Sequence, residues 1–132
     1  MKNKTIHKVQ FYETDAMGIV HHSNYFRFFE EARLDWLESK GLLENYHRAD
    51  QINFAVIEAS ANYRAPAQYG DKISVETQIT AEKLRLIFNY KIYDSRNRLL
   101  VDGKTVHVAV DPDKKPKRIP KEILELLESQ NG

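Results

Sequence analysis

Residues 23–40 read SNYFRFFEEARLDWLESK, and this stretch decides the fold. Its apolar residues recur at the spacing of one face of an α-helix. They are Tyr25, Phe29, Ala32, Trp36 and Leu37. Phe26 and Phe28 widen this apolar stripe well beyond one narrow face. The first half of the helix is therefore too apolar for a surface position, and we expect other elements to wrap around it.

The same stretch carries signals for both ends of the helix. Ser23 and Asn24 are favourable N-cap residues, and Gly41 suits the left-handed conformation that commonly follows the last turn. We therefore expect the helix to begin at this Ser-Asn pair and to end at about Lys40.

The rest of the chain reads mainly as β-strand. A short β-branched stretch from Thr5 to Phe11 precedes the helix. Four strands follow it, at residues 52–64, 72–82, 84–92 and 99–111, and a short C-terminal helix begins at Pro120. One long apolar helix with four consecutive strands favours the α+β class. We expect a curled five-stranded antiparallel sheet wrapped around one long central helix.

Composition narrows the class of protein further. The chain has 132 residues, and we expect residues 1–132 to form one domain. Twenty Lys and Arg against nineteen Asp and Glu give a net charge of +1, so we expect no nucleic-acid partner. The N-terminus has no apolar core of the kind a signal peptide needs, and no stretch is long enough to span a bilayer. We expect a cytoplasmic protein with no membrane insertion.

The residue pattern also excludes several kinds of site. The five glycines form neither a dinucleotide-binding fingerprint nor a phosphate loop, and no serine lies in a G-x-S-x-G motif. The five histidines form no H-x-x-x-H pair, and cysteine is absent. We therefore expect no metal site and no redox or organic cofactor.

The polar stretch from Asp15 to Tyr25 carries the most chemistry. A carboxylate, a glycine three residues later and a helix start form a compact corner. Unpaired N–H groups at a helix N-terminus stabilise a developing oxyanion, and a nearby carboxylate can activate water or attack a carbonyl. Gly18 permits a tight turn close to a ligand. On spacing alone, the alternative is that Asp15 caps a turn and that His21 and His22 are polar surface residues.

The motif Asp15-x-x-Gly18-x-Val20-x-His22-x-x-Tyr25 resembles the signature of the 4-hydroxybenzoyl-CoA thioesterase family. The segment FFEEAR at residues 28–33 and the motif Tyr63-x-x-Pro66-x-x-Tyr69-Gly70-Asp71 fit the same family. The chain is most similar to the acyl-CoA thioesterase branch associated with the Tol-Pal system. This resemblance covers roughly residues 5–112 and implies the hotdog fold, a curled antiparallel sheet around one long helix.

The resemblance implies an acyl-CoA thioesterase that converts an acyl- or aroyl-CoA to the free acid and coenzyme A. Asp15 would be the catalytic carboxylate, either as nucleophile or as general base toward water. The backbone N–H of His22 would polarise the thioester carbonyl, and its side chain is a candidate for orienting water or the carbonyl. Gly18 would lie close to the substrate, and Tyr25 would pack beneath the loop rather than react.

Three more residues are candidate substrate contacts. We expect an acyl groove between the central helix and the strand around Ser60, crossing a subunit boundary. Lys83 and Arg85, near a strand turn, are candidates for the phosphates of coenzyme A. Phe11 stands where members of the branch often have a tyrosine, which weakens any transfer of substrate preference.

Two other functions remain open alongside acyl-CoA hydrolysis. One is a non-catalytic hotdog module that binds an acyl group or an acyl carrier protein. Retention of Asp15, Gly18 and His22 together argues against it, because a binder needs no carboxylate at the thioester. The other is a thioesterase whose substrate is carried by an acyl carrier protein. Dehydration is disfavoured, because the D-x-N-P-x-H arrangement of the hotdog hydratases is missing.

One helix cannot cover both faces of a five-stranded sheet. Either an edge or the other face of the sheet should therefore be buried by a second copy of the chain. We expect a homo-oligomer, either a dimer or a dimer of dimers that forms a homotetramer.

Overall fold

The computed structural model describes residues 2–42, 53–82 and 84–131. Its elements are β1 (Lys2–Lys8), the 3-10 turn η1 (Phe11–Glu13), α1 (Asn24–Ser39), β2 (Asn53–Tyr63), β3 (Lys72–Glu82), β4 (Arg85–Tyr93), β5 (Leu99–Val110), β6 (Pro116–Lys117) and α3 (Lys121–Asn131). The expected central helix, four long strands and C-terminal helix are all present. The start of the strand expected at residue 52 lies outside the described residues.

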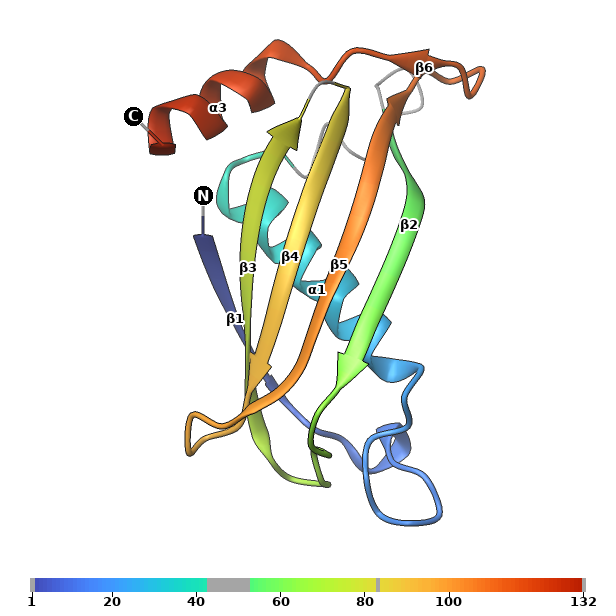
Figure 1. The fold of residues 1–132 in the computed structure, drawn as a ribbon, viewed down its shortest axis with the longest axis vertical. Coiled ribbons are helices and arrows are strands. Elements are labelled where there is room, and N and C mark those ends of the chain that lie inside the picture. The colour runs from blue at the N-terminus through green and yellow to red at the C-terminus, as the bar shows by residue number, and fades with distance from the viewer. Residues whose placement is uncertain (1, 43–52, 83, 132) are drawn as a thin grey trace.

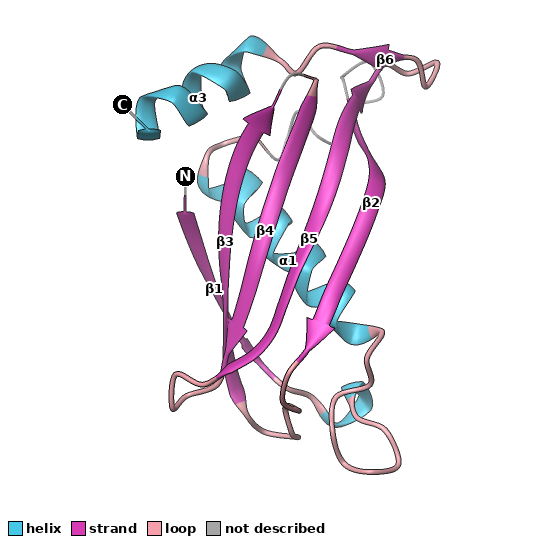
Figure 2. Cartoon of the chain, in the orientation of Figure 1, coloured by secondary structure: helices cyan, strands magenta, loops and turns pink. Residues whose placement is uncertain are grey.

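The long strands form one antiparallel sheet in the order β1-β3-β4-β5-β2, and β6 adds to β5. Figure 1 shows α1 lying along one face of this sheet, which curves around it. Figure 2 shows the same layers by type, with α3 at the end of the sheet where β3 finishes. Ile123 and Leu127 of α3 join the hydrophobic core. The expected α+β architecture is confirmed.

The capping predicted for α1 is found at its C-terminal end but not at its N-terminal end. At the C-terminal end Gly41 has φ of +70°, and the backbone N–H groups of Gly41 and Leu42 donate to Glu38 and Leu37. This pattern is the Schellman motif that the glycine predicted. At the N-terminal end Ser23 makes no capping hydrogen bond with its side chain. The expectation of a serine cap is therefore wrong, because the Ser23 hydroxyl lies 2.8 Å from His21 Nδ1 instead.

The first strand ends earlier than the sequence predicts. β1 stops at Lys8, and Phe11 belongs to η1. A reciprocal capping box closes that turn, in which the Gln10 backbone N–H donates to Glu13 Oε1 at 2.7 Å. This local hydrogen bonding outweighs the β-propensity of the segment. The short β6, in a proline-punctuated basic segment, was not predicted either.

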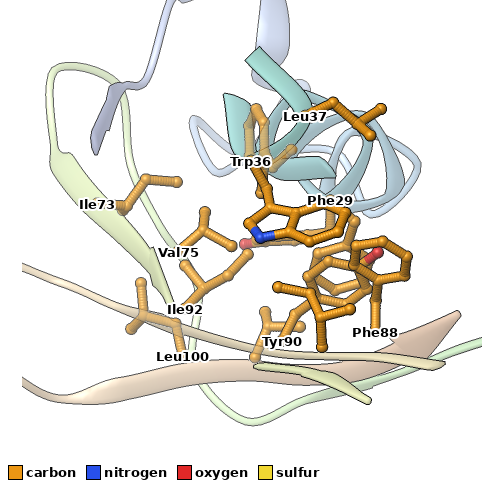
Figure 3. Packing of buried hydrophobic residues seen from close by; sticks show 14 of the residues in the cluster. Phe29, Trp36, Leu37, Ile73, Val75, Phe88, Tyr90, Ile92 and Leu100 are labelled. Carbon is orange, nitrogen blue, oxygen red and sulfur yellow. The ribbon is translucent and has the colours of Figure 1, made fainter. Parts of the chain in front are cut away.

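The contact between α1 and the sheet centres on one aromatic stack. Phe29 lies nearly parallel to Tyr90, with ring centroids 4.2 Å apart and an interplanar angle of 7° (Figure 3). Gly103 of β5 lies beneath this stack. A Cβ added there would approach the Phe29 ring to 2.6 Å and the Ser60 carbonyl oxygen to 2.8 Å. The absence of a side chain at Gly103 is therefore what lets α1 sit this close to the sheet.

A chain of polar side chains runs through this otherwise apolar core. Arg33 of α1 donates from Nη1 to the Tyr90 hydroxyl at 3.1 Å, and that hydroxyl lies 2.6 Å from Thr105 Oγ1. Thr105 Oγ1 in turn lies 2.9 Å from His107 Nε2. We call these four residues the core polar chain. Burial, reinforced by the positive charge of Arg33, lowers the pKa of His107 from 6.5 to about 4.

Gly103→Ala is expected to destabilise the fold by about 1–3 kcal/mol, because the new methyl group overlaps a buried ring and a backbone carbonyl. Urea denaturation would measure this loss. Lys104→Ala is the matched control, since Lys104 is the next residue of β5 and forms a half-exposed ion pair with Glu58. It should change stability by less than about 1 kcal/mol. An unchanged stability of Gly103→Ala would contradict the packing described here.

His107 should make stability depend on pH. Between pH 6.5 and pH 4 the unfolded chain protonates this residue and the folded chain does not. Stability should therefore fall as the pH drops through this window, by at most about 3 kcal/mol from this residue. Arg33 and Glu30 line the same cavity as His107, and Tyr90 is linked to His107 through Thr105.

Urea titrations at several pH values should show a shallower pH slope for His107→Leu than for the unsubstituted protein. His21→Leu, which changes an exposed histidine, should keep the original slope. If His107→Leu does not fold, an NMR titration of the His107 ring provides the same test. A ring that titrates near pH 6.5 would refute the prediction.

Candidate functional site

The candidate site lies in the corner where the chain passes from β1 into α1, at the lower end of the molecule in Figure 1. The loop of residues 14–22 is closed at its base by the Glu13 carbonyl oxygen. That oxygen accepts from the His21 backbone N–H at 2.9 Å and from Asn24 Nδ2 at 2.8 Å. Val20 also donates its backbone N–H to the Ala67 carbonyl at 2.9 Å. The loop is thus fixed to η1, to α1 and to the segment after β2.

Asp15 does cap a turn, as the simpler interpretation predicts. Its Oδ1 accepts from the Met17 backbone N–H at 2.8 Å, and its own carbonyl accepts from Gly18 N–H at 3.0 Å. Gly18 has φ of +78°, a conformation that favours glycine. Within the described part of the chain Oδ2 of Asp15 has no hydrogen-bond partner. The turn therefore holds the carboxylate in place and leaves one oxygen available.

Asp15 and His22 line the same cleft, which has a volume of about 380 Å³. Its lining residues are Asp15, Ile19, Val20, His22, Tyr25, Tyr63, Arg64, Ala65 and Pro66. Among the described residues the His22 backbone N–H has no acceptor, while its carbonyl accepts from Tyr25 N–H. The cleft therefore combines a free carboxylate oxygen with a free backbone donor at the start of α1.

Aromatic rings form the floor and one wall of this cleft. Tyr25 is buried, and its hydroxyl accepts from the Ala67 backbone N–H at 3.4 Å. Burial raises the pKa of Tyr25, so its hydroxyl stays neutral and structural. Tyr63 lies 5.4 Å from the Tyr25 ring and donates its hydroxyl to the His22 carbonyl at 3.3 Å. The ring of His22 is exposed and stacks on His21 at 4.3 Å.

The structure does not bring the other predicted substrate contacts to this cleft within one chain. Ser60 pairs with Lys104 and lies on the sheet face opposite α1, in a separate hollow. A bulge between Val56 and Glu58 reverses which residues of β2 face the helix. Arg85 begins β4, whose first residues lie at the opposite end of the sheet from the loop between β1 and α1 (Figure 1). Lys83 lies outside the described residues.

Two structural features bear on metals and membranes. Among the described residues no three His, Asp or Glu side chains are grouped so that they could hold a metal ion. No helix in the described part of the chain is both long and apolar enough to cross a bilayer.

Residues 9–127 match the model of the Thioesterase-like superfamily. The chain belongs to that family. This match identifies the protein as a thioester hydrolase with the hotdog fold, as the sequence motif predicts.

Individual relatives agree with this assignment. The Escherichia coli protein named acyl-CoA thioester hydrolase YbgC is 34% identical over 119 residues, which is 89% of each chain. The crystal structure of Slr0204 from Synechocystis, a 1,4-dihydroxy-2-naphthoyl-CoA thioesterase, superimposes with a TM-score of 0.91 at 26% identity. That alignment covers 100% of this chain and 99% of the other. A structure from Aquifex aeolicus gives 37% identity and a TM-score of 0.87, over 95% and 98% of the two chains.

Sequence reasoning missed part of this cleft. Tyr63 belongs to the family motif but is not predicted as a site residue, and Arg64 is not predicted at all, although both line the cleft. A strand that ends in an aromatic residue just before Ala65-Pro66 was the available signal. The core polar chain was also missed, because Thr105 and His107 stand at inward positions of a strand where apolar residues are usual.

Proposed function

We propose that this thioesterase hydrolyses acyl-CoA or aroyl-CoA at the cleft between Asp15 and His22. The observation that carries this proposal is the pairing of one free carboxylate oxygen with one free helix-start N–H in a single cleft. Relatives whose names specify acyl-CoA and 1,4-dihydroxy-2-naphthoyl-CoA support both aliphatic and aromatic acids as the substrate class.

The Asp15 carboxylate can start hydrolysis in two ways. As a nucleophile it attacks the thioester carbonyl, expels coenzyme A as a thiolate and forms an anhydride that water then opens. As a general base it takes a proton from water, whose oxygen attacks the same carbonyl and expels the thiolate. In the general-base route the water oxygen ends in the released acid, whereas in the nucleophilic route water opens one carbonyl of the anhydride, which releases the acid and restores the Asp15 carboxylate. In both routes a proton from water ends on the thiol. Because a thiolate leaves readily, neither route requires a metal.

The backbone N–H of His22 is suited to the negative charge that develops on the carbonyl oxygen. It lies at the start of α1, where the helix dipole adds a partial positive charge. The His21 carbonyl, which belongs to the same peptide as this N–H, accepts from the Asn24 backbone N–H at 2.9 Å. This donor is therefore already oriented before a substrate arrives. The exposed His22 ring is left free to contact the acyl or thiol part of the substrate.

Asp15→Asn should lower turnover by at least about 10²-fold, or about 2.7 kcal/mol, because the amide keeps the turn but lacks the reactive charge. Thiol release from a panel of short, long and aromatic acyl-CoAs measures this effect. His22→Ala should cost less, because alanine retains the backbone N–H. Asp71→Asn is the matched control, since Asp71 caps a similar exposed turn through Gln68 N–H but lies outside the cleft.

Near-normal turnover of Asp15→Asn on the best acyl-CoA would refute the proposed mechanism. Equal losses in folded Asp15→Asn and His22→Ala proteins would instead show that the histidine side chain is catalytic. Absence of thiol release by the unsubstituted protein from every acyl-CoA would favour a non-catalytic module or an acyl-carrier-protein substrate.

We propose further that two copies of the chain pair through β2. Both β1 and β2 are edges of the sheet, but their surfaces differ. β1 carries three lysines in seven residues, which protects an edge from pairing. β2 has eleven residues with one charge, and Val56 and Ile57 are half exposed on it. Antiparallel pairing of β2 with its copy would cover this edge and build a two-fold dimer.

Light scattering should find a dimer or a multiple of it at micromolar concentration. Ile57→Lys should shift the protein toward monomer, because it places a charge in the apolar edge. Ile6→Lys is the matched control, since Ile6 is equally exposed but lies on β1. A monomeric unsubstituted protein, or dissociation caused by Ile6→Lys alone, would overturn this arrangement.

A further inference from the structure

A second cavity lies between α1 and the sheet, apart from the Asp15 cleft. Its volume is about 130 Å³, close to that of cavities that hold a benzene ring. Its lining residues are Glu30, Arg33, Leu34, Trp36, Leu37, Phe54, Leu86, Phe88 and His107. The nearest lining positions on α1 are Tyr25 of the cleft and Glu30 of the cavity, which lie five residues or about 7.5 Å apart along the helix.

We propose that this cavity binds a compact apolar molecule, one aromatic ring in size, that carries a hydrogen-bond-accepting oxygen. The apolar lining fits the ring, and the core polar chain supplies the donors. The proposal concerns a site separate from the catalytic cleft, so it does not depend on the function proposed for Asp15.

The direction of the hydrogen bonds follows from Arg33, which has donors and no acceptor. It donates to the Tyr90 oxygen, so the Tyr90 proton goes to Thr105 Oγ1. No other acceptor for the Thr105 hydroxyl exists among the described residues, so its proton goes to His107 Nε2. In this order each hydroxyl proton has one acceptor. A neutral His107 then carries its own proton on Nδ1.

Nδ1 of His107 is available to a ligand. The residue is 3% exposed, and within the described part of the chain Nδ1 has no partner. Thr77 Oγ1 is the one side-chain polar atom there that is both unpartnered and fully enclosed. The Nδ1 atom is therefore not fully enclosed by protein, and His107 is one of the residues that line the cavity.

Arg33 adds a second group of donors at the same wall. It uses Nη1 for Tyr90, and its other nitrogens have no acceptor among the described residues. Two donors at one wall match the lone pairs of a carboxylate, carbonyl or phenolic oxygen. Glu30 also lines the cavity and is exposed, so its charge opposes that of Arg33. Carboxylate, carbonyl and phenolic ligands all offer the oxygen acceptor that this wall requires. Whether the ligand is charged or neutral is decided by the experiment below.

The test uses four one-ring probes on the full chain, with His107 followed by NMR. Benzoate and 4-methylphenol carry an acceptor oxygen, toluene carries none, and benzylamine carries a cationic donor. Benzoate, 4-methylphenol or both should shift the His107 ring signals, with affinities in the millimolar range expected of so few atoms. Toluene should bind at least about tenfold more weakly, and benzylamine should not bind. Comparing the first two probes decides between an anionic and a neutral oxygen.

Two variants locate the binding. Leu34→Trp places a larger side chain at a lining position that is not part of the core polar chain, and it should abolish the shifts. Leu84→Trp, at an exposed leucine outside the cavity, should leave them unchanged. Arg33→Met, if it folds, should reduce the preference for the oxygenated probes, whereas Arg27→Met on the same helix should not. The proposal is overturned if no probe binds, if toluene binds as tightly as the best oxygenated probe, or if the shifts appear at His22 and Tyr63 instead.

Discussion

The stack of Phe29 on Tyr90 fixes how closely α1 approaches the sheet, and the remaining geometry depends on that distance. Gly103 makes the approach possible, because any side chain there would meet the Phe29 ring. With α1 held at this depth, its first residues emerge beside the end of β2, where Tyr63 reaches the His22 carbonyl. The contact between Phe29 and Tyr90 thus positions the backbone N–H of His22, although His22 lies two helical turns away from Phe29.

The same close approach explains why polar groups are tolerated in the core. Arg33 follows Phe29 by one turn and reaches the hydroxyl of the residue on which Phe29 stacks. The hydroxyls of Tyr90 and Thr105 and Nε2 of His107 all find partners within the core polar chain, which keeps the cost of burying them low. The cavity next to this chain is bounded by large aromatic and aliphatic residues that cannot collapse further without moving α1.

Hydrophobic periodicity predicted α1, the four long strands and the end of α1 at Gly41, because these depend on local pattern and a known backbone motif. The spacing of Asp15, Gly18 and the helix start placed Asp15 in a corner beside α1, and the family resemblance added His22 to it. Hydrophobic periodicity failed in β2, where one extra residue at a bulge reverses which side chains face the helix. The bulge near Ile57 turns Ser60 to the face away from α1, and nothing in the alternation of β2 marks it. Contacts such as Arg33 with Tyr90 join residues 57 apart, so no local pattern reveals them.

The Glu13 carbonyl receives both the backbone of His21 and the side chain of Asn24, and this has a consequence for how the loop can vary. Residues at both ends of the loop are joined through the Glu13 carbonyl oxygen, so the loop forms a ring closed by hydrogen bonds. These bonds at the base of the ring fix the position at which the chain enters α1. Lengthening such a ring at its tip, near Ala16 and Met17, costs chain entropy that grows only with the logarithm of its length. A longer tip would therefore leave the start of α1 in place but would disturb the turn that holds the Asp15 carboxylate through Met17 and Gly18. The base of the ring sets where the helix begins, and its tip sets where the carboxylate lies.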